Sequence, residues 1–466
     1  MRSRHIGSHR RSAAEDLGHR PWADHGAGRM FMHRPAFGQA AIQMLVIAHC
    51  SRRTGLSYSI TKEGYSLTYT YPNPPPAKEA SDAMIVSTLG LYSSGSTWLF
   101  NVVRCICAKH SDKSFSVYAD SGGDVMSCFG DEIEYLVIKS HHLDNDFLKI
   151  IRATSSKLII TVREARDGVT SLMNRFRTSE SDALSQISLS ASAIAVARNM
   201  FGHMIFVYED RFMDNKDTIK KIADYIEVEI SDDFASEILA QFDREKVASD
   251  ITAQFEHASA DITYDDATHW HVGHIGDGKS SKWSETLSDA AAAAIDEAIN
   301  PFCQAELRPG LVINWSSYLF RHSDGRNLEA GQVITTGMND HLLIYGPYLF
   351  LPPGRWRVDF RFRRTGVGGT SILKIDAILG YESGLLGSSA ARLDGTDEQH
   401  CGFEFEHTHL SHPVETRVHA MSYGSASNVE FLGVRLTYLA LVASNRGKAL
   451  QIVSAECRET FEPSVM

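Results

Sequence analysis

The segment Gly90–Trp98, GLYSSGSTW, combines glycines and hydroxyl side chains between an apolar run and a segment with helical character. It has the outline of a phosphate-binding loop, in which glycines permit a tight turn and the first N–H groups of a helix bind an oxyanion. Where such loops carry lysine, this sequence has Ser96. Without that cation, nucleoside triphosphate hydrolysis fits poorly. We therefore expect either a site for a single phosphate bearing a transferable group or a plain Ser/Gly turn.

Two later segments place ionisable and hydroxyl groups where apolar runs end. Lys139, Ser140 and His141 follow the run LVI, while Arg163 ends LIITVR and Ser171 comes eight residues later. In doubly wound sheets the ligand crevice lies at the carboxyl ends of the strands. We therefore expect these groups to share one edge with the serine-rich loop.

Alternating apolar runs and helical patterns extend from Met84 to about Leu307. The runs MIVSTLG, EYLVIK, KLIITVR and HMIFVYED are typical of buried strands. Helices are predicted over 97–110 and 232–242, and two more begin at Asp167 and Asp217. The aspartates at positions 167, 217 and 232 are expected to cap these helices. A further helix is predicted in an alanine-rich segment that ends at Pro301. The pattern predicts an α/β fold with a P-loop-type parallel sheet flanked by helices.

Beyond Pro309 the hydrophobic pattern changes to period two, which predicts a C-terminal all-β sandwich. In GRWRVDFRFRR the apolar residues point to one face and four arginines to the other, namely Arg355, Arg357, Arg361 and Arg363. This arginine stripe is either a solvated face or a surface for an anionic saccharide. We accordingly predict an extension at 1–82 that is poorly ordered, an α/β domain at 83–308, a sandwich at 309–450 and a tail at 451–466.

Composition narrows the function classes. The 466-residue chain has a net charge of −11, which disfavours nucleic acid as its main partner. No apolar segment approaches the roughly 20 residues that span a bilayer, and no secretory signal is evident, so a cytoplasmic location is expected. The seven cysteines have no metal-binding spacing, and we expect no metal site.

Together these segments resemble the sulfotransferase family, which transfers a sulfuryl group from 3′-phosphoadenylyl sulfate (PAPS). The resemblance covers about residues 84–305. The family's 5′-phosphosulfate loop is matched by Ser94, Gly95, Ser96, Thr97 and Trp98, and its strand-end K-T-H by Lys139, Ser140 and His141. Its 3′-phosphate motif is matched by Arg163 and Ser171, and its closing loop by GHIGDGKSSKW from Gly273, with Gly276 and Lys279.

The resemblance implies that His141 is the general base and that Lys139 stabilises developing charge. It also implies PAPS as co-substrate without a metal, and an acceptor hydroxyl, which we expect on a carbohydrate. Two of these residues could instead have purely structural roles: Arg163 as the partner in an ion pair, and Trp98 as part of the hydrophobic core. Two departures from the family pattern stand out, Ser93 in place of a basic residue and His271-Val272-Gly273 where relatives often have R-K-G. The alternatives are a glycan-binding or scaffold protein with a decayed nucleotide site, and an atypical P-loop kinase.

Overall fold

The computed structural model describes residues 56–61, 64–69, 83–128, 133–154, 156–256, 265–271, 275–276, 278–329, 331–336, 340–365, 370–380, 384–421 and 427–441. Within the extension predicted at 1–82, strands β1 (Leu56–Thr61) and β2 (Gly64–Tyr69) pair as an antiparallel hairpin. The rest of the extension before residue 83 and the tail at 451–466 lie outside the described residues. The domain boundaries therefore stay predictions.

A parallel five-stranded sheet forms the centre of the α/β part. Its strands lie in the order β4-β5-β3-β6-β7, with β3 (Met84–Gly90) in the middle. The others are β4 (Ser114–Tyr118), β5 (Tyr135–Ser140), β6 (Lys157–Val162) and β7 (His203–Val207). The four strands predicted from apolar runs are confirmed. We missed β4 because it is a half-exposed edge strand without a continuous apolar run.

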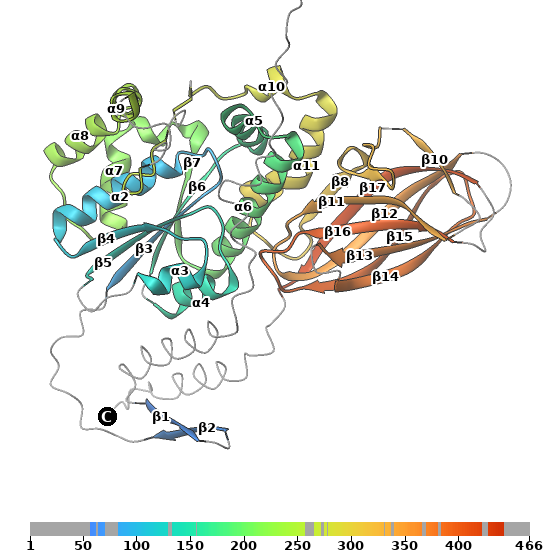
Figure 1. Cartoon of the computed structure of the whole chain (residues 1–466), viewed down its shortest axis with the longest axis horizontal. Coiled ribbons are helices and arrows are strands. Elements are labelled where there is room, and N and C mark those ends of the chain that lie inside the picture. The colour runs from blue at the N-terminus through green and yellow to red at the C-terminus, as the bar shows by residue number, and fades with distance from the viewer. Residues whose placement is uncertain are drawn as a thin grey trace, which may run out of the picture. The chain divides into compact units, whose positions relative to one another are not determined.

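Helices cover both faces of this sheet, as Figure 1 shows. One face packs against α2 (Ser96–His110), α7 (Lys216–Tyr225), α8 (Asp232–Gln241) and α9 (Arg244–Glu256). The other packs against α3 (Gly122–Ser127), α4 (Asn145–Ala153), α5 (Ala165–Phe176), α6 (Glu180–Met200) and α11 (Asp289–Gln304). The short α10 (Trp283–Thr286) precedes α11. The α/β class predicted from the sequence is confirmed.

Several helix ends differ from the prediction. Glu164, Asn215 and Ser231 cap α5, α7 and α8, one to three residues before the aspartates that we expected to do so. Helix α11 continues through Pro301 to Gln304, because Phe302 and Cys303 are buried and hold the last turn in place. The sequence gives little periodicity for α6, since serines and alanines are buried on several sides of it.

The C-terminal part is an antiparallel β-sandwich, as predicted. One sheet has the order β10-β17-β12-β15, with β8 also paired to β17, and the other has the order β14-β13-β16-β11-β9. Trp356, Val358, Phe360 and Phe362 of β12 are at most 1% exposed and form part of the core. The strands are β8 (Val312–Ser316), β9 (Arg321–His322), β10 (Val333–Thr336), β11 (His341–Leu349), β12 (Gly354–Thr365), β13 (Ser371–Leu379), β14 (Gly384–Leu393), β15 (Glu398–His407), β16 (Val414–Ala420) and β17 (Ser427–Ala440).

Candidate functional site

The serine-rich loop joins the end of β3 to the beginning of α2. Gly95 has a left-handed backbone with φ of 81° and precedes the helix without a side-chain cap. A Cβ atom at Gly95 would lie 2.8 Å from Met213 Sδ, so a side chain there would strain the left-handed backbone and force Met213 to shift. The first N–H groups of α2, at Ser96, Thr97 and Trp98, thus face the loop without a capping side chain, and a helix N-terminus in this state attracts anions.

The hydroxyl of Ser94 holds the loop in place rather than facing outward. Its Oγ donates to the Leu91 carbonyl at 2.6 Å and lies 2.7 Å from Thr161 Oγ1 on β6. Ser94 is also fully buried. It therefore anchors the loop to the sheet and leaves oxyanion binding to the helix N–H groups.

Lys139, at the end of β5, reaches the first turn of α2. Its Nζ donates to Thr97 Oγ1 at 2.8 Å, and the side chain is buried. Burial and the Arg175 cation lower the pKa of Lys139 to about 7, while Asp120 opposes this shift. The loop that lacks its own lysine thus obtains an ammonium group from the neighbouring strand.

His141 is held in a defined orientation. Its Nδ1 lies 2.7 Å from the Gly90 carbonyl, and its ring stacks on Tyr92 with centroids 4.0 Å apart. The carbonyl can only accept, so Nδ1 carries the proton and Nε2 has the free lone pair. Burial, followed by the nearby Lys139 cation, lowers the pKa of His141 well below its ordinary value. The imidazole is therefore neutral, which is the form that can accept a proton.

Asp120 fixes the end of β5, and the sequence analysis did not identify it. Its carboxylate accepts from Ser140 Oγ at 2.8 Å, from the His141 N–H at 3.3 Å and from the Tyr118 hydroxyl at 2.6 Å. His142 Nδ1 also lies 3.5 Å from it. The indication available in the sequence was Asp120 shortly after a strand that ends at Tyr118, but that strand was β4, which we had missed.

Arg163, at the end of β6, links the loop to the segment that precedes α10. Its guanidinium donates to the carbonyls of Ser93 and Lys279, at 3.1 Å in each case. It also lies 3.5 Å from Asp167 and stacks over Tyr208 at 4.2 Å. Each terminal nitrogen has a second N–H, so the guanidinium holds the two carbonyls and still has donors for a phosphate.

The predicted closing segment is attached to α5. Asp167 accepts from the N–H groups of Ser281 at 2.7 Å and Trp283 at 3.3 Å. The backbone carbonyl of Gly276 accepts from Arg244 at 3.1 Å, and the Lys279 side chain is exposed. Gly273, also predicted for this segment, lies outside the described residues. The carboxylate that we took for a helix cap thus positions the closing segment instead.

Two further basic residues belong to this region and were missed. Burial and the Arg163 cation lower the pKa of Arg175, one turn after the half-buried Ser171 on α5. Burial, followed by Lys139, lowers the pKa of His269 to about 4. Arg175 lies near the end of a helix and His269 lies in a segment without a regular pattern, so neither belongs to a motif that the sequence analysis recognised. Lys139, Arg163 and Arg175 therefore form a cluster of cations, in which Arg175 lowers the pKa of Lys139 and Arg163 lowers that of Arg175. His269 lies near Lys139 as a neutral imidazole.

Trp98 is half-buried and packs edge-on against Phe212, with ring centroids 5.5 Å apart. Its Nε1 is buried and makes no hydrogen bond within the described part of the chain. Core packing therefore accounts for the indole face toward Phe212, while the nucleotide contact that the family resemblance implies for Trp98 stays a prediction.

Replacing Arg163 with lysine should weaken binding of adenosine 3′,5′-bisphosphate by about 10- to 100-fold, because the compact ammonium group lacks the planar fork of donors that reaches both carbonyls and a phosphate. Isothermal titration calorimetry measures this directly. Arg152→Lys, at an exposed position of α4, provides the matched control and should bind like wild type. Equal affinities of the two variants would show that Arg163 is only an internal ion-pair partner.

In the described residues no group of three or more histidine, cysteine or acidic side chains could hold a metal ion. None of the described helices combines the length and the apolar character needed to span a membrane.

Comparison with known proteins gave one family match. Residues 131–307 match the model of the sulfotransferase domain, a range that begins after the serine-rich loop. No curated protein matches the chain.

Among solved structures, a retinol dehydratase in complex with retinol and PAP is 12% identical, with 57% of this chain and 96% of that chain covered and a TM-score of 0.36. A mouse sulfotransferase complexed with PAP is 14% identical, with 47% and 82% covered and a TM-score of 0.34. A structure described as CBM4 is 16% identical, with 28% and 88% covered and a TM-score of 0.19. From similarity at this level we draw no conclusion about ligands. The family match confirms the resemblance seen in the sequence over residues 131–307, which match a sulfotransferase domain.

Proposed function

We propose that the chain transfers a sulfuryl group from PAPS to an acceptor hydroxyl, with the nucleotide bound between the loop, Lys139, Arg163 and the closing segment. The observation that carries the proposal is the buried cation cluster. The Arg175 cation lowers the pKa of Lys139, and the Arg163 cation lowers the pKa of Arg175. Such repulsion costs stability unless an anion compensates it, and a bisphosphate nucleotide supplies that charge.

The residues fit a donor with two separate anionic groups. Lys139 and the uncapped N-terminus of α2 lie together at the loop, because the lysine bonds to Thr97. Arg163 contacts the loop at another point, through the Ser93 carbonyl. We assign the phosphosulfate to the first group and the 3′-phosphate to the second, with Ser171 as an additional donor. Lys139 would thereby replace the basic residue missing at Ser93.

The donor supplies the sulfuryl group: the acceptor oxygen bonds to sulfur, and the bond from sulfur to the bridging phosphate oxygen breaks, releasing adenosine 3′,5′-bisphosphate. His141 Nε2 accepts the proton of the acceptor hydroxyl, since Nδ1 is committed to the Gly90 carbonyl. Lys139 stabilises the negative charge that develops on the leaving oxygen. Asp120 acts as a positioning residue through the backbone of His141.

A carbohydrate acceptor and a cytoplasmic location are also part of the proposal. The first is supported by the period-two sandwich that follows the sulfotransferase domain and by the polar hollow on it described below. The second is supported by the cytosolic origin of the donor that the family resemblance implies.

The pH dependence of donor binding tests the cation cluster. Lys139 has a pKa of about 7 without ligand, so above pH 7 a growing fraction must take up a proton before it can bind the anion. Affinity for adenosine 3′,5′-bisphosphate should therefore fall between pH 7 and 9, by up to about tenfold per pH unit. The nucleotide's phosphates are already ionised in this range, since their second pKa is about 6.

Calorimetry at pH 7, 8 and 9 measures this slope, and the matched control is Lys139→Met, which lacks the titrating amine. The variant should bind more weakly and show no slope. A thermal shift with magnesium and ATP but none with the bisphosphate would favour the kinase. No shift with either nucleotide would favour a decayed site.

A further inference from the structure

The arginine stripe of β12 is neutralised by acidic partners on the same face of the sandwich. Arg357 pairs with Asp359 at 2.9 Å, Arg361 with Glu398 at 2.8 Å and Arg363 with Glu430 at 3.0 Å, and Arg355 pairs with Glu404. Exposed pairs of this kind contribute little and leave little net charge. The stripe as a whole is therefore not the anion-binding surface that its sequence suggested.

A hollow of about 420 Å³ interrupts this face, lined by Val312, Asn314, Arg361, Glu398, His400 and Arg435. Two glycines account for it. Gly433 is the cross-strand partner of Arg361, and Gly402 is the partner of Asp359, so each occupies a position on this face without a side chain. Gly433 has φ of 110°, and a Cβ there would lie 2.3 Å from the Trp315 carbonyl oxygen. The backbone thus builds the depression into the sheet.

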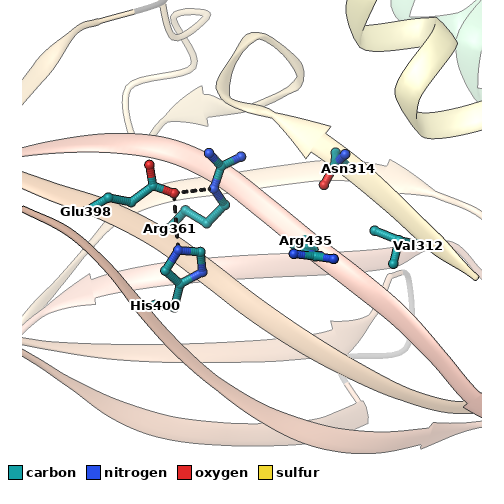
Figure 2. Close-up of a pocket in the computed structure, with 6 residues that line it drawn as sticks. All are labelled: Val312, Asn314, Arg361, Glu398, His400 and Arg435. Carbon is teal, nitrogen blue, oxygen red and sulfur yellow. Dashed lines mark hydrogen bonds and ion pairs between the residues drawn. The ribbon is translucent and has the colours of Figure 1, made fainter. Parts of the chain in front are cut away.

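Two of the lining side chains have no partner within the described residues. The residue Arg435 on β17 is exposed and Asn314 is half-buried, and neither side chain makes an ion pair or hydrogen bond there. The two residues are cross-strand partners on β17 and β8. Figure 2 shows them on one side of the hollow, away from Arg361, Glu398 and His400. An unpaired guanidinium beside an amide is a site for a carboxylate or sulfate.

The opposite side of the hollow offers hydrogen bonds of another kind. Glu398 bonds to Arg361 Nε at 2.8 Å and lies 3.2 Å from His400 Nε2. Its carboxylate retains further acceptor sites, which suit hydroxyl groups. A bare inorganic anion would be repelled by Glu398, whereas a polyhydroxylated anion would use it. The volume is within the ~300–1,000 Å³ of ligand sites.

We propose that this hollow binds an acidic saccharide, with Arg435 and Asn314 on its carboxylate or sulfate and Glu398 and His400 on its hydroxyls. The site lies on the sandwich and needs no part of the sulfotransferase site. Only the role of this saccharide site rests on the proposed function: it would hold a polymeric acceptor, or the sulfated product, on the enzyme.

The test is calorimetry of the full chain with three tetrasaccharides: a sulfated uronate oligomer (from heparin), an unsulfated uronate oligomer (from polygalacturonate) and neutral cellotetraose. At least one acidic oligomer should bind, and cellotetraose should not. Arg435→Ala should weaken that binding by at least about tenfold. Arg392→Ala removes the same charge from the other sheet, where Arg392 is exposed and paired with Asp394 at 3.0 Å, and should bind like wild type.

A preference for the sulfated oligomer would identify sulfate as the recognised group, and equal binding of both acidic oligomers would identify the carboxylate. The proposal is wrong if no oligomer binds, if cellotetraose binds as well as the acidic oligomers, or if the two arginine variants are affected equally. Binding of adenosine 3′,5′-bisphosphate is measured on the same samples. If the wild-type protein does not bind the bisphosphate, the proposed function is contradicted but the saccharide site is not. If Arg435→Ala binds the bisphosphate like wild type, the variant is folded.

Discussion

Replacing His141 with alanine is expected to lower kcat by about 10²- to 10⁴-fold, the contribution of a positioned general base. The imidazole is neutral, because burial and the Lys139 cation keep its pKa well below the ordinary value. Its Nδ1 is committed to the Gly90 carbonyl, so Nε2 is the atom that accepts the proton. Donor affinity should change little, since the loop N–H groups, Lys139 and Arg163 remain. Transfer of labelled sulfate from PAPS measures kcat, and calorimetry measures donor binding.

The adjacent histidine provides the control. His142 is also near the end of β5, but its Nδ1 lies 3.5 Å from Asp120, whereas the Nδ1 of His141 bonds to Gly90 of the loop. His142→Ala should therefore reduce kcat by less than about tenfold, as expected for a residue that only helps to position others. The opposite ranking of the two variants would move the general base to His142. Equal, small effects would exclude both.

The lowered pKa of His141 also determines how kcat depends on pH below 7.5. Because His141 stays neutral until well below its ordinary pKa, kcat should not decline between pH 7.5 and 6. An unperturbed histidine would already be half protonated near pH 6.5.

The fold could be predicted where local pattern and tertiary environment agree. Strands β3, β5 and β6 are buried on both faces and read as continuous apolar runs. Strand β4 is half exposed, and α6 buries serines along with its alanines, so neither has the periodicity that identifies an element. Helix α11 runs past Pro301 because buried side chains outweigh the local preference of proline to end a helix. The errors in the predicted elements therefore arise where tertiary packing, and not the local sequence pattern, determines whether an element forms and where it ends.

The site could be predicted only where its residues form contiguous motifs. The loop, Lys139 and His141 follow strands directly, and the structure brings them together through Thr97 and Gly90. Three other residues come close to Lys139 or His141 only in the folded chain and belong to no recognisable motif: Asp120, Arg175 and His269. The double use of Arg163, bonded to both Ser93 and Lys279, also depends on segments far apart in the chain. Pairings of this kind are set by the fold, not by spacing in the sequence.

Lys139→Met should lower kcat by about 10²- to 10³-fold and at the same time stabilise the ligand-free protein. The loss of activity follows from removing the cation that faces the developing charge. The gain in stability follows from the same cation: it is buried and repelled by Arg175, and its partner in the loop is only a neutral hydroxyl. Methionine has a similar length and no charge to bury. The free energy of unfolding should rise by about 1–4 kcal/mol at pH 7, as for other buried ionic groups replaced by apolar ones.

The pH dependence distinguishes this cause from a general packing effect. The ammonium pKa is lowered from 10.5 to about 7, so between these values the unfolded chain binds a proton that the folded chain has released. Wild-type stability therefore gains from this group as the pH rises through that window, and the difference from Lys139→Met should shrink. Urea unfolding of both proteins at pH 7 and 9 measures the difference. A constant difference would mean that Lys139 is not the strained cation, and a destabilised variant would mean that its bond to Thr97 outweighs the repulsion.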